Sequence, residues 1–225
     1  MYKQRMSYAD YVEEVEKIYK IERRETYFGF IIRDFIQLIL TESEQLVAVW
    51  DNKGYKDDAK NPYHKRKNYA DSHSLQDFII VSEQYDYTNT TKPYVSIELK
   101  RPDLEKYEGL GLNNNKEQIV AEFEYCDFII LTDCVTWIFL KKDEPIEDGK
   151  VVCLMQDGKW LQMEQRDCDN ERMGNIYMRE PEQWNVLVNM IRTFVTKAKK
   201  SNMLEADAGA DGNGKGQRER HGCPM

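Results

Sequence analysis

The chain has 225 residues, of which 41% are hydrophobic and 32% charged, and its formal net charge is −8. This length is sufficient for one sizeable domain with a buried core. The acidic balance excludes a uniformly basic surface. It does not exclude a nucleic-acid partner, because a local group of basic side chains is enough to attract phosphates.

Cellular location is predicted from three features of the sequence. No apolar run is long enough to span a bilayer, and the first residues lack the apolar segment of a secretory signal. The five cysteines are odd in number, form no CxxC pair and are not clustered with histidines at zinc-ligand spacing. We therefore expect a cytoplasmic protein with reduced thiols, no zinc and no membrane partner.

Two helices are predicted at the start of the chain. Ser7 and Asp10 form a helix-start pattern, and a helical stripe follows at Tyr11, Val15, Ile18 and Tyr19. A second helix is predicted over 25–40. Its apolar stripe consists of Phe28, Ile31, Ile32, Phe35, Leu38 and Ile39.

Residues 47–50 are expected to form a short strand, and 51–74 a long polar loop. This loop region carries His64 and His73, either of which could approach a phosphate or simply be exposed. Two strands are then predicted over 75–81 and 94–100. Side chains alternate along a strand, so Glu98 and Lys100 share one face of the second strand.

The remaining elements complete an α/β pattern. We predict a helix over 116–125 with Ile119, Val120 and Phe123 facing inward, and strands over 127–132 and 136–140. A hairpin is expected to turn at Asp157-Gly158, and Pro181 to open a last helix. The buried stripe of that helix is predicted at Trp184, Leu187, Val188, Ile191 and Val195.

These elements predict a single α/β domain over 1–203, with a central mixed sheet and helices on both faces. The composition changes at Leu204, after which small and charged residues dominate. We expect 204–225 to be a disordered tail, because it has too little apolar surface to bury.

The chemistry is expected where the two strands 75–81 and 94–100 bring Asp77, Glu98 and Lys100 together. Two carboxylates can hold Mg²⁺, which prefers hard oxygen ligands and keeps several waters, against a substrate phosphate. Mn²⁺ is the expected substitute. Lys100 would orient the attacking water or stabilise the charged transition state. The competing interpretation is a surface strand with a cross-strand ion pair.

Residues 75–100 resemble the core motif of the PD-(D/E)XK nuclease superfamily, which has the restriction-endonuclease-like fold. Asp77 matches the first acid and Glu98-Leu99-Lys100 the second half of the motif, while Gln76 stands where the motif has proline. Downstream, a helix carrying Gln118 and the strands over 127–133 and 136–139 are similar to the nuclease domains of type I restriction subunits. The resemblance covers roughly 25–140.

The resemblance implies a restriction-endonuclease-like core and a Mg²⁺-dependent endonuclease that hydrolyses phosphodiesters, with DNA as the favoured substrate and restriction or antiphage defence as the setting. Members often add an acid from the first core helix, and Glu25 is favoured over Asp34 for that third metal ligand. The competing interpretation of Glu25 is a solvated acid at a helix start, where it suits the helix dipole. Gln118 could contact the site or be an ordinary exposed polar residue.

Arg101 could touch a phosphate or only end its strand. Related enzymes that cut both strands often form homodimers, and the helix segment 184–195 could serve such an interface or cover the sheet. The alternative function is a nuclease-fold module without turnover that binds nucleic acid or a protein partner.

Overall fold

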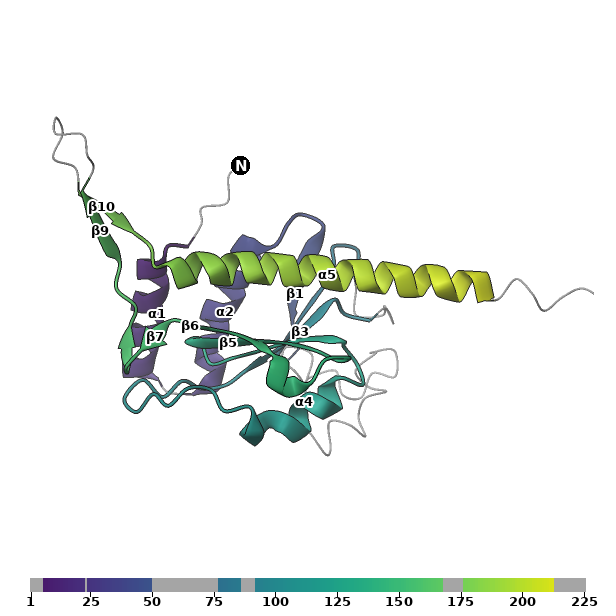
Figure 1. The fold of residues 1–225 in the computed structure, drawn as a ribbon, viewed down its shortest axis with the longest axis horizontal. Coiled ribbons are helices and arrows are strands. Elements are labelled where there is room, and N and C mark those ends of the chain that lie inside the picture. The colour runs from purple at the N-terminus through teal and green to yellow at the C-terminus, as the bar shows by residue number, and fades with distance from the viewer. Residues whose placement is uncertain (1–5, 23, 50–76, 86–91, 168–175, 213–225) are drawn as a thin grey trace, which may run out of the picture.

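The computed structural model describes residues 6–22, 24–49, 77–85, 92–167 and 176–212. A six-stranded sheet with the order β1-β2-β3-β4-β5-β6 forms its centre (Figure 1). β3 and β4 are parallel, whereas all the other neighbouring pairs are antiparallel. The predicted mixed sheet is therefore confirmed. Its strands are β1 (Glu44–Ala48), β2 (Phe78–Ser82), β3 (Val95–Leu99), β4 (Phe128–Thr132), β5 (Thr136–Lys141) and β6 (Lys150–Cys153).

Helices cover both faces of this sheet, as the sequence predicts. Helices α1 (Tyr8–Ile21), α2 (Glu25–Ile39) and α5 (Glu182–Gly212) lie on one face, and α4 (Lys116–Glu122) lies on the other (Figure 1). The predicted start of α1 is confirmed as a capping box, in which the Ser7 hydroxyl accepts a hydrogen bond from the Asp10 backbone N–H at 3.1 Å. None of the described helices is long and apolar enough to cross a membrane.

The larger core lies between the sheet and α1, α2 and α5. Its centre is a group of aromatic rings, including Phe35 and Trp184, which stack with their centroids 4.8 Å apart. Trp137 from β5 and Tyr11 from α1 pack against Phe35 from two other directions. Since all five residues of the stripe predicted for the last helix are buried here, α5 covers the sheet.

The smaller core lies between α4 and the other face of the sheet. Ile119 and Phe123 pack there against alternate residues of β4 and β5, including Ile129 and Leu131. The inward orientation predicted for Val120 is wrong, because its side chain is 53% exposed. The reason is periodicity: Ile119 and Phe123 are four residues apart and share one helix face, from which Val120 is turned away.

The C-terminal third contains both a confirmed and an unpredicted hairpin. The predicted turn at Asp157-Gly158 joins β7 (Met155–Gln156) to β8 (Lys159–Trp160), and both turn residues have positive φ, 50° and 71°. These angles are typical of a tight hairpin turn. A second pair, β9 (Glu164–Asp167) with β10 (Ile176–Arg179), was not predicted and precedes α5. Short 3₁₀ turns, η3 (Asn113–Asn115) and η4 (Ile146–Asp148), precede α4 and β6.

The predicted tail boundary at 204 requires a correction, because α5 continues to Gly212. An established helix adds one hydrogen bond for each residue that it fixes, so it can extend past its packed part without new apolar burial. Residues 204–210 include Leu, Glu and three Ala, which favour this extension. Residues 213–225 lie outside the described part of the chain.

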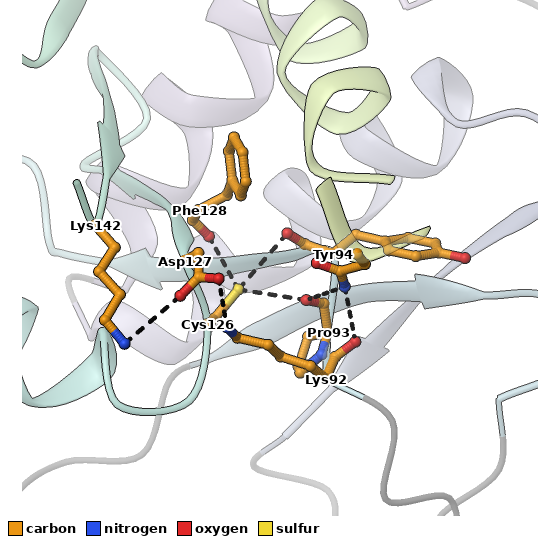
Figure 2. Close-up of polar contacts among 8 residues, drawn as sticks. Lys92, Pro93, Tyr94, Cys126, Asp127, Phe128 and Lys142 are labelled. Atoms are coloured by element: carbon orange, nitrogen blue, oxygen red, sulfur yellow. Dashed lines mark hydrogen bonds and ion pairs between the residues drawn. The ribbon is translucent and has the colours of Figure 1, made fainter. Parts of the chain in front are cut away.

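The amino end of the parallel pair β3–β4 is held by a polar cluster (Figure 2). Asp127, directly before β4, forms ion pairs with Lys92 and, at 3.7 Å, with Lys142. The Cys126 thiol donates to backbone carbonyls of both chain segments, those of Pro93 and Tyr94 before β3 and that of Phe128, at 3.2 Å, in β4. From α5, the Asn202 amide donates to the carbonyls of Lys92 and of Pro93, each at 3.2 Å. These contacts join α5, β3 and β4 at the sheet end opposite to Lys100.

Candidate active site

The strand pairing brings Asp77 and Glu98 together. Phe78 pairs with Ile97 in the antiparallel register of β2 and β3, so Asp77, one residue earlier, lies opposite Glu98. Side chains directly opposite in an antiparallel pair lie on the same face, with Cβ atoms about 4.5–5.5 Å apart. The Asp77 carboxylate also accepts a hydrogen bond from the Leu99 backbone N–H at 2.9 Å, which fixes it against β3.

Lys100 reaches back to the same place from the end of β3. Its ammonium group donates to a Glu98 carboxylate oxygen at 2.7 Å and to the Gln118 side-chain oxygen at 2.9 Å. Gln118 comes from α4, so the interpretation of this residue as an ordinary exposed polar group is wrong. Asp77, Glu98, Lys100 and Gln118 thus form one cluster at the carboxyl end of β3.

Glu122 is a member of this cluster that the sequence prediction missed. It lies one helical turn after Gln118, and its side chain accepts hydrogen bonds from Ser96 Oγ at 3.1 Å and from Gln118 Nε2 at 3.4 Å. It is 1% exposed, so the polar part of α4 faces Ser96 and Glu98 while the apolar part faces β4 and β5. The four-residue spacing of Gln118 and Glu122, parallel to that of Ile119 and Phe123, is the signal in the sequence.

Burial makes these carboxylates unusually basic. Glu98 is 3% exposed, and burial raises its pKa, with the charge of Glu122 adding to the rise and Lys100 opposing it. Burial also raises the pKa of Asp77 to about 7, and the Glu98 charge contributes. The Glu122 pKa rises for the same reason, against the hydrogen bond from Ser96. Charge on this group of acids is therefore disfavoured unless a cation is present.

Lys100 is the cation of the cluster. Burial alone would lower its pKa, but Glu98 and, to a smaller extent, Glu25 and Asp77 raise the pKa above the ordinary lysine value. The lysine is therefore charged at neutral pH, while three buried or half-buried acids act on it. One lysine cannot balance all of them, which leaves the cluster attractive to a further positive charge.

Of the two candidates for the third acid, Glu25 is the one whose charge reaches the cluster. It begins α2, is half-buried, and influences the pKa of both Asp77 and Lys100. Asp34 lies about two and a half helical turns further on, where it pairs with Arg33 at 3.1 Å. Arg101 is exposed directly after Lys100. The backbone hydrogen bond from Lys106 is the main cause that lowers the pKa of Asp103, and the Arg101 charge adds to it. His64 and His73 lie outside the described residues.

The donor set suits Mg²⁺ or Mn²⁺. Among the described residues, no three His, Cys, Asp or Glu side chains already surround a common point, but Mg²⁺ needs only one or two carboxylates with waters and a substrate phosphate. The second carboxylate oxygen of Glu98 is buried without a hydrogen-bond partner. A buried, unpartnered carboxylate oxygen is costly, and a hard cation would satisfy it.

The fold and the cluster together define a mixed α/β protein with several buried acids and one lysine at the carboxyl end of its central parallel strand pair. No protein-family model matches the chain, and neither the curated proteins nor the solved structures provide a match. The functional argument therefore depends on the geometry and chemistry of the site.

Proposed function

We propose that the chain is a Mg²⁺-dependent endonuclease with a restriction-endonuclease-like core, which hydrolyses phosphodiester bonds, with DNA as the favoured substrate. Restriction or antiphage defence is the setting that the resemblance suggests, and we propose it only as an analogy. The observation that carries the proposal is the convergence of Asp77, Glu98 and Lys100, because strand pairing joins two residues that are 21 positions apart, Asp77 and Glu98.

Each residue has a defined role in this proposal. Asp77 and Glu98 would hold the metal, with Glu25 contributing charge from the start of α2. When bound, the metal lowers the pKa of a water and offsets the charge that develops on the phosphate. Lys100, held by Glu98 and Gln118, presents a fixed positive charge for the scissile phosphate or the attacking water. Glu122 and Gln118 position Glu98 and Lys100 from α4.

The test is cleavage of a supercoiled plasmid with Mg²⁺ by the wild type and by three variants. Glu98→Gln and Lys100→Ala should each lower the rate about 100-fold or more, because each removes a charge that acts on the transition state. Glu117→Gln is the matched control, since Glu117 is exposed on the same helix as Gln118. This control should cleave at the wild-type rate. Equal rates for the wild type and Lys100→Ala would refute the mechanism.

Metal titration by calorimetry separates this function from that of a binding module without turnover. The wild type should bind Mg²⁺ or Mn²⁺ with heat that is absent in Glu98→Gln. If neither cation binds at millimolar concentration and the plasmid stays intact, the binding-module alternative replaces the nuclease.

A further inference from the structure

Helix α2 carries an exposed row of two aromatic rings and two guanidinium groups that the candidate active site does not use. The Arg24 guanidinium lies 5.2 Å from the centre of the Tyr27 ring, and that of Arg33 lies 5.3 Å from the centre of the Phe30 ring. The two rings meet edge to face with their centroids 6.3 Å apart. These four residues are three apart in sequence and form one continuous row, here called the α2 ladder.

The α2 ladder is not part of the core. The buried side of α2 consists of Phe28, Ile31, Ile32, Phe35, Ile36 and Ile39, whereas Tyr27 and Phe30 are 40% and 47% exposed. They are the two aromatic members among the large apolar side chains that are exposed in the described part of the chain. Both rings therefore lie outside the side of α2 that packs into the core.

The ladder begins beside the candidate active site. Arg24 directly precedes Glu25, whose charge acts on Asp77 and Lys100. From Arg24 to Arg33 the helix rises about 14 Å, at 1.5 Å for each residue. That length equals about four nucleotides of a stacked strand at 3.4 Å each. The ladder therefore leads away from the site over a distance that suits a short segment of nucleic acid.

The charges of the ladder favour an anionic partner with flat rings. Arg24 pairs with Glu22 at 2.8 Å and Arg33 with Asp34 at 3.1 Å, but both pairs have solvent-exposed arginines. Such pairs contribute little stability, so phosphates can compete for the guanidinium groups. The ring faces of Tyr27 and Phe30 can stack on any base. Two adjacent stacking rings with a phosphate-binding arginine on each side match unpaired nucleotides better than a duplex, whose bases are already stacked.

We infer that the α2 ladder is a track for unpaired nucleotides of the substrate strand, with bases on Tyr27 and Phe30 and phosphates on Arg24 and Arg33. The inference deepens the proposed function, because it assumes a nucleic-acid substrate at the neighbouring site. It assigns the substrate class as strands with a single-stranded segment of about four nucleotides next to the scissile phosphate.

The test is fluorescence anisotropy with a labelled 12-nucleotide oligodeoxyadenylate and an abasic strand of equal length, both in EDTA so that cleavage does not interfere. The wild type should bind the adenylate more tightly than the abasic strand. Tyr27→Ala and Phe30→Leu should each weaken adenylate binding about 5-fold or more, because stacking on one ring contributes about 1–3 kcal/mol. Both should leave abasic binding unchanged, while Arg24→Ala should weaken both.

Leu204→Ala is the matched control, since Leu204 is 70% exposed and belongs to another helix, α5; it should bind like the wild type. Tyr27→Phe keeps the ring and should therefore bind the adenylate like the wild type. Equal adenylate affinities for the wild type, Tyr27→Ala and Phe30→Leu would overturn the inference, as would a wild type that binds the two strands equally. Oligomer loss in Phe30→Leu with unchanged DNA binding would instead assign the ladder to a protein contact. Because these measurements use no metal, plasmid cleavage decides the proposed function separately.

Discussion

At the scale of single residues, the central fact is the environment of Glu98. One of its carboxylate oxygens binds Lys100, while the other is buried without a partner. Asp77 lies opposite on β2 and Glu122 approaches from α4, so three acids share a poorly hydrated space. The repulsion among them opposes folding in the absence of a cation and favours cation binding.

This repulsion predicts a pH-dependent stability. The folded protein keeps a proton on Asp77 up to about pH 7, whereas the unfolded chain loses it near the ordinary value of 3.8. Over that range the folded state binds more protons, so the free energy of unfolding falls as the pH rises. In EDTA, the melting temperature should fall between pH 5 and pH 8.5, and Asp77→Asn should reduce this fall.

Saturating Mg²⁺ at pH 8 should raise the melting temperature of the wild type by several degrees, because a ligand that binds only the folded state stabilises it. Differential scanning calorimetry provides both measurements. The prediction fails if the wild type in EDTA is equally stable at pH 5 and pH 8.5, or if Asp77→Asn has the same pH profile.

Asp77, Glu98 and Lys100 could be predicted from the sequence because strand periodicity is local and the motif lies in two apolar strands. The structure places Asp77 opposite Glu98 and joins Glu98 to Lys100, whereas the roles of the three residues stay a prediction. Glu122 was missed because its role depends on where α4 docks. Its neighbour Gln118 was recognised only through a resemblance, and the sequence alone left its contact open. The four-residue spacing of Gln118 and Glu122 indicates a shared helix face, but not which part of the sheet that face contacts.

At the scale of elements, the turn between η4 and β6 leaves no room for a side chain at Gly149. A Cβ atom added at Gly149 would lie 2.6 Å from Leu140 Cδ2 and 3.2 Å from both Ile138 Cγ2 and the Ile146 carbonyl oxygen. These side chains belong to the smaller core, which lies between α4 and the sheet. Gly149 therefore allows β6 to approach β5 closely.

Gly149→Ala should destabilise the protein by about 1–3 kcal/mol, the usual cost of overpacking a core. Gly111→Ala is the control, because its nearest contact would be an ordinary 3.6 Å from Asn114 Nδ2. Urea denaturation should give a lower midpoint for Gly149→Ala and an unchanged one for Gly111→Ala. Equal midpoints for Gly149→Ala and the wild type would contradict the packing argument.

Most elements were predictable where the apolar period is clear: α2, α5 and the central strands lie where their stripes predict. The exceptions have physical reasons. The inward prediction for Val120 failed because α4 is short and Ile119 and Val120 are adjacent. The periodicity of so few apolar residues does not show which of the two faces the core. The pair β9–β10 was missed because one of its two strands, β9 (Glu164–Asp167), is entirely polar and has no alternating apolar side chains.

At the scale of the whole molecule, α5 packs along the larger core and then contacts the chain segments before β1 and β3. Among the described residues, the last two residues of α5 that form hydrogen bonds with the sheet region are Lys199 and Asn202. Lys199 binds Ser43 and Glu44, and Asn202 binds the Lys92 carbonyl. Beyond Leu204 the helix continues away from the body of the protein (Figure 1). The stability of the domain should therefore depend on α5 up to Asn202 and little on the later turns of the helix.

Two shortened chains test this prediction. A chain that ends at Leu204 should unfold within about 0.5 kcal/mol of the full chain, the range of neutral surface changes. A chain that ends at Lys197 loses buried Ala198 and the contacts of Lys199 and Asn202. It should lose about 1–3 kcal/mol. Chemical denaturation of both gives the comparison, and equal stability of the two shortened chains would contradict it.

The antiparallel pairing of β2 and β3 determines how freely the number of residues between the two acids can vary among proteins with such a site. Asp77 stands where one strand enters the sheet and Lys100 where its neighbour leaves it, so both lie at one rim. β2 ends at Ser82 and β3 begins at Val95, both at the opposite rim, so the connection joins the two strands at the end away from Asp77 and Lys100. Evolution can therefore lengthen or shorten that connection without moving the acids, and the number of residues between them is a poor guide to recognising such a site.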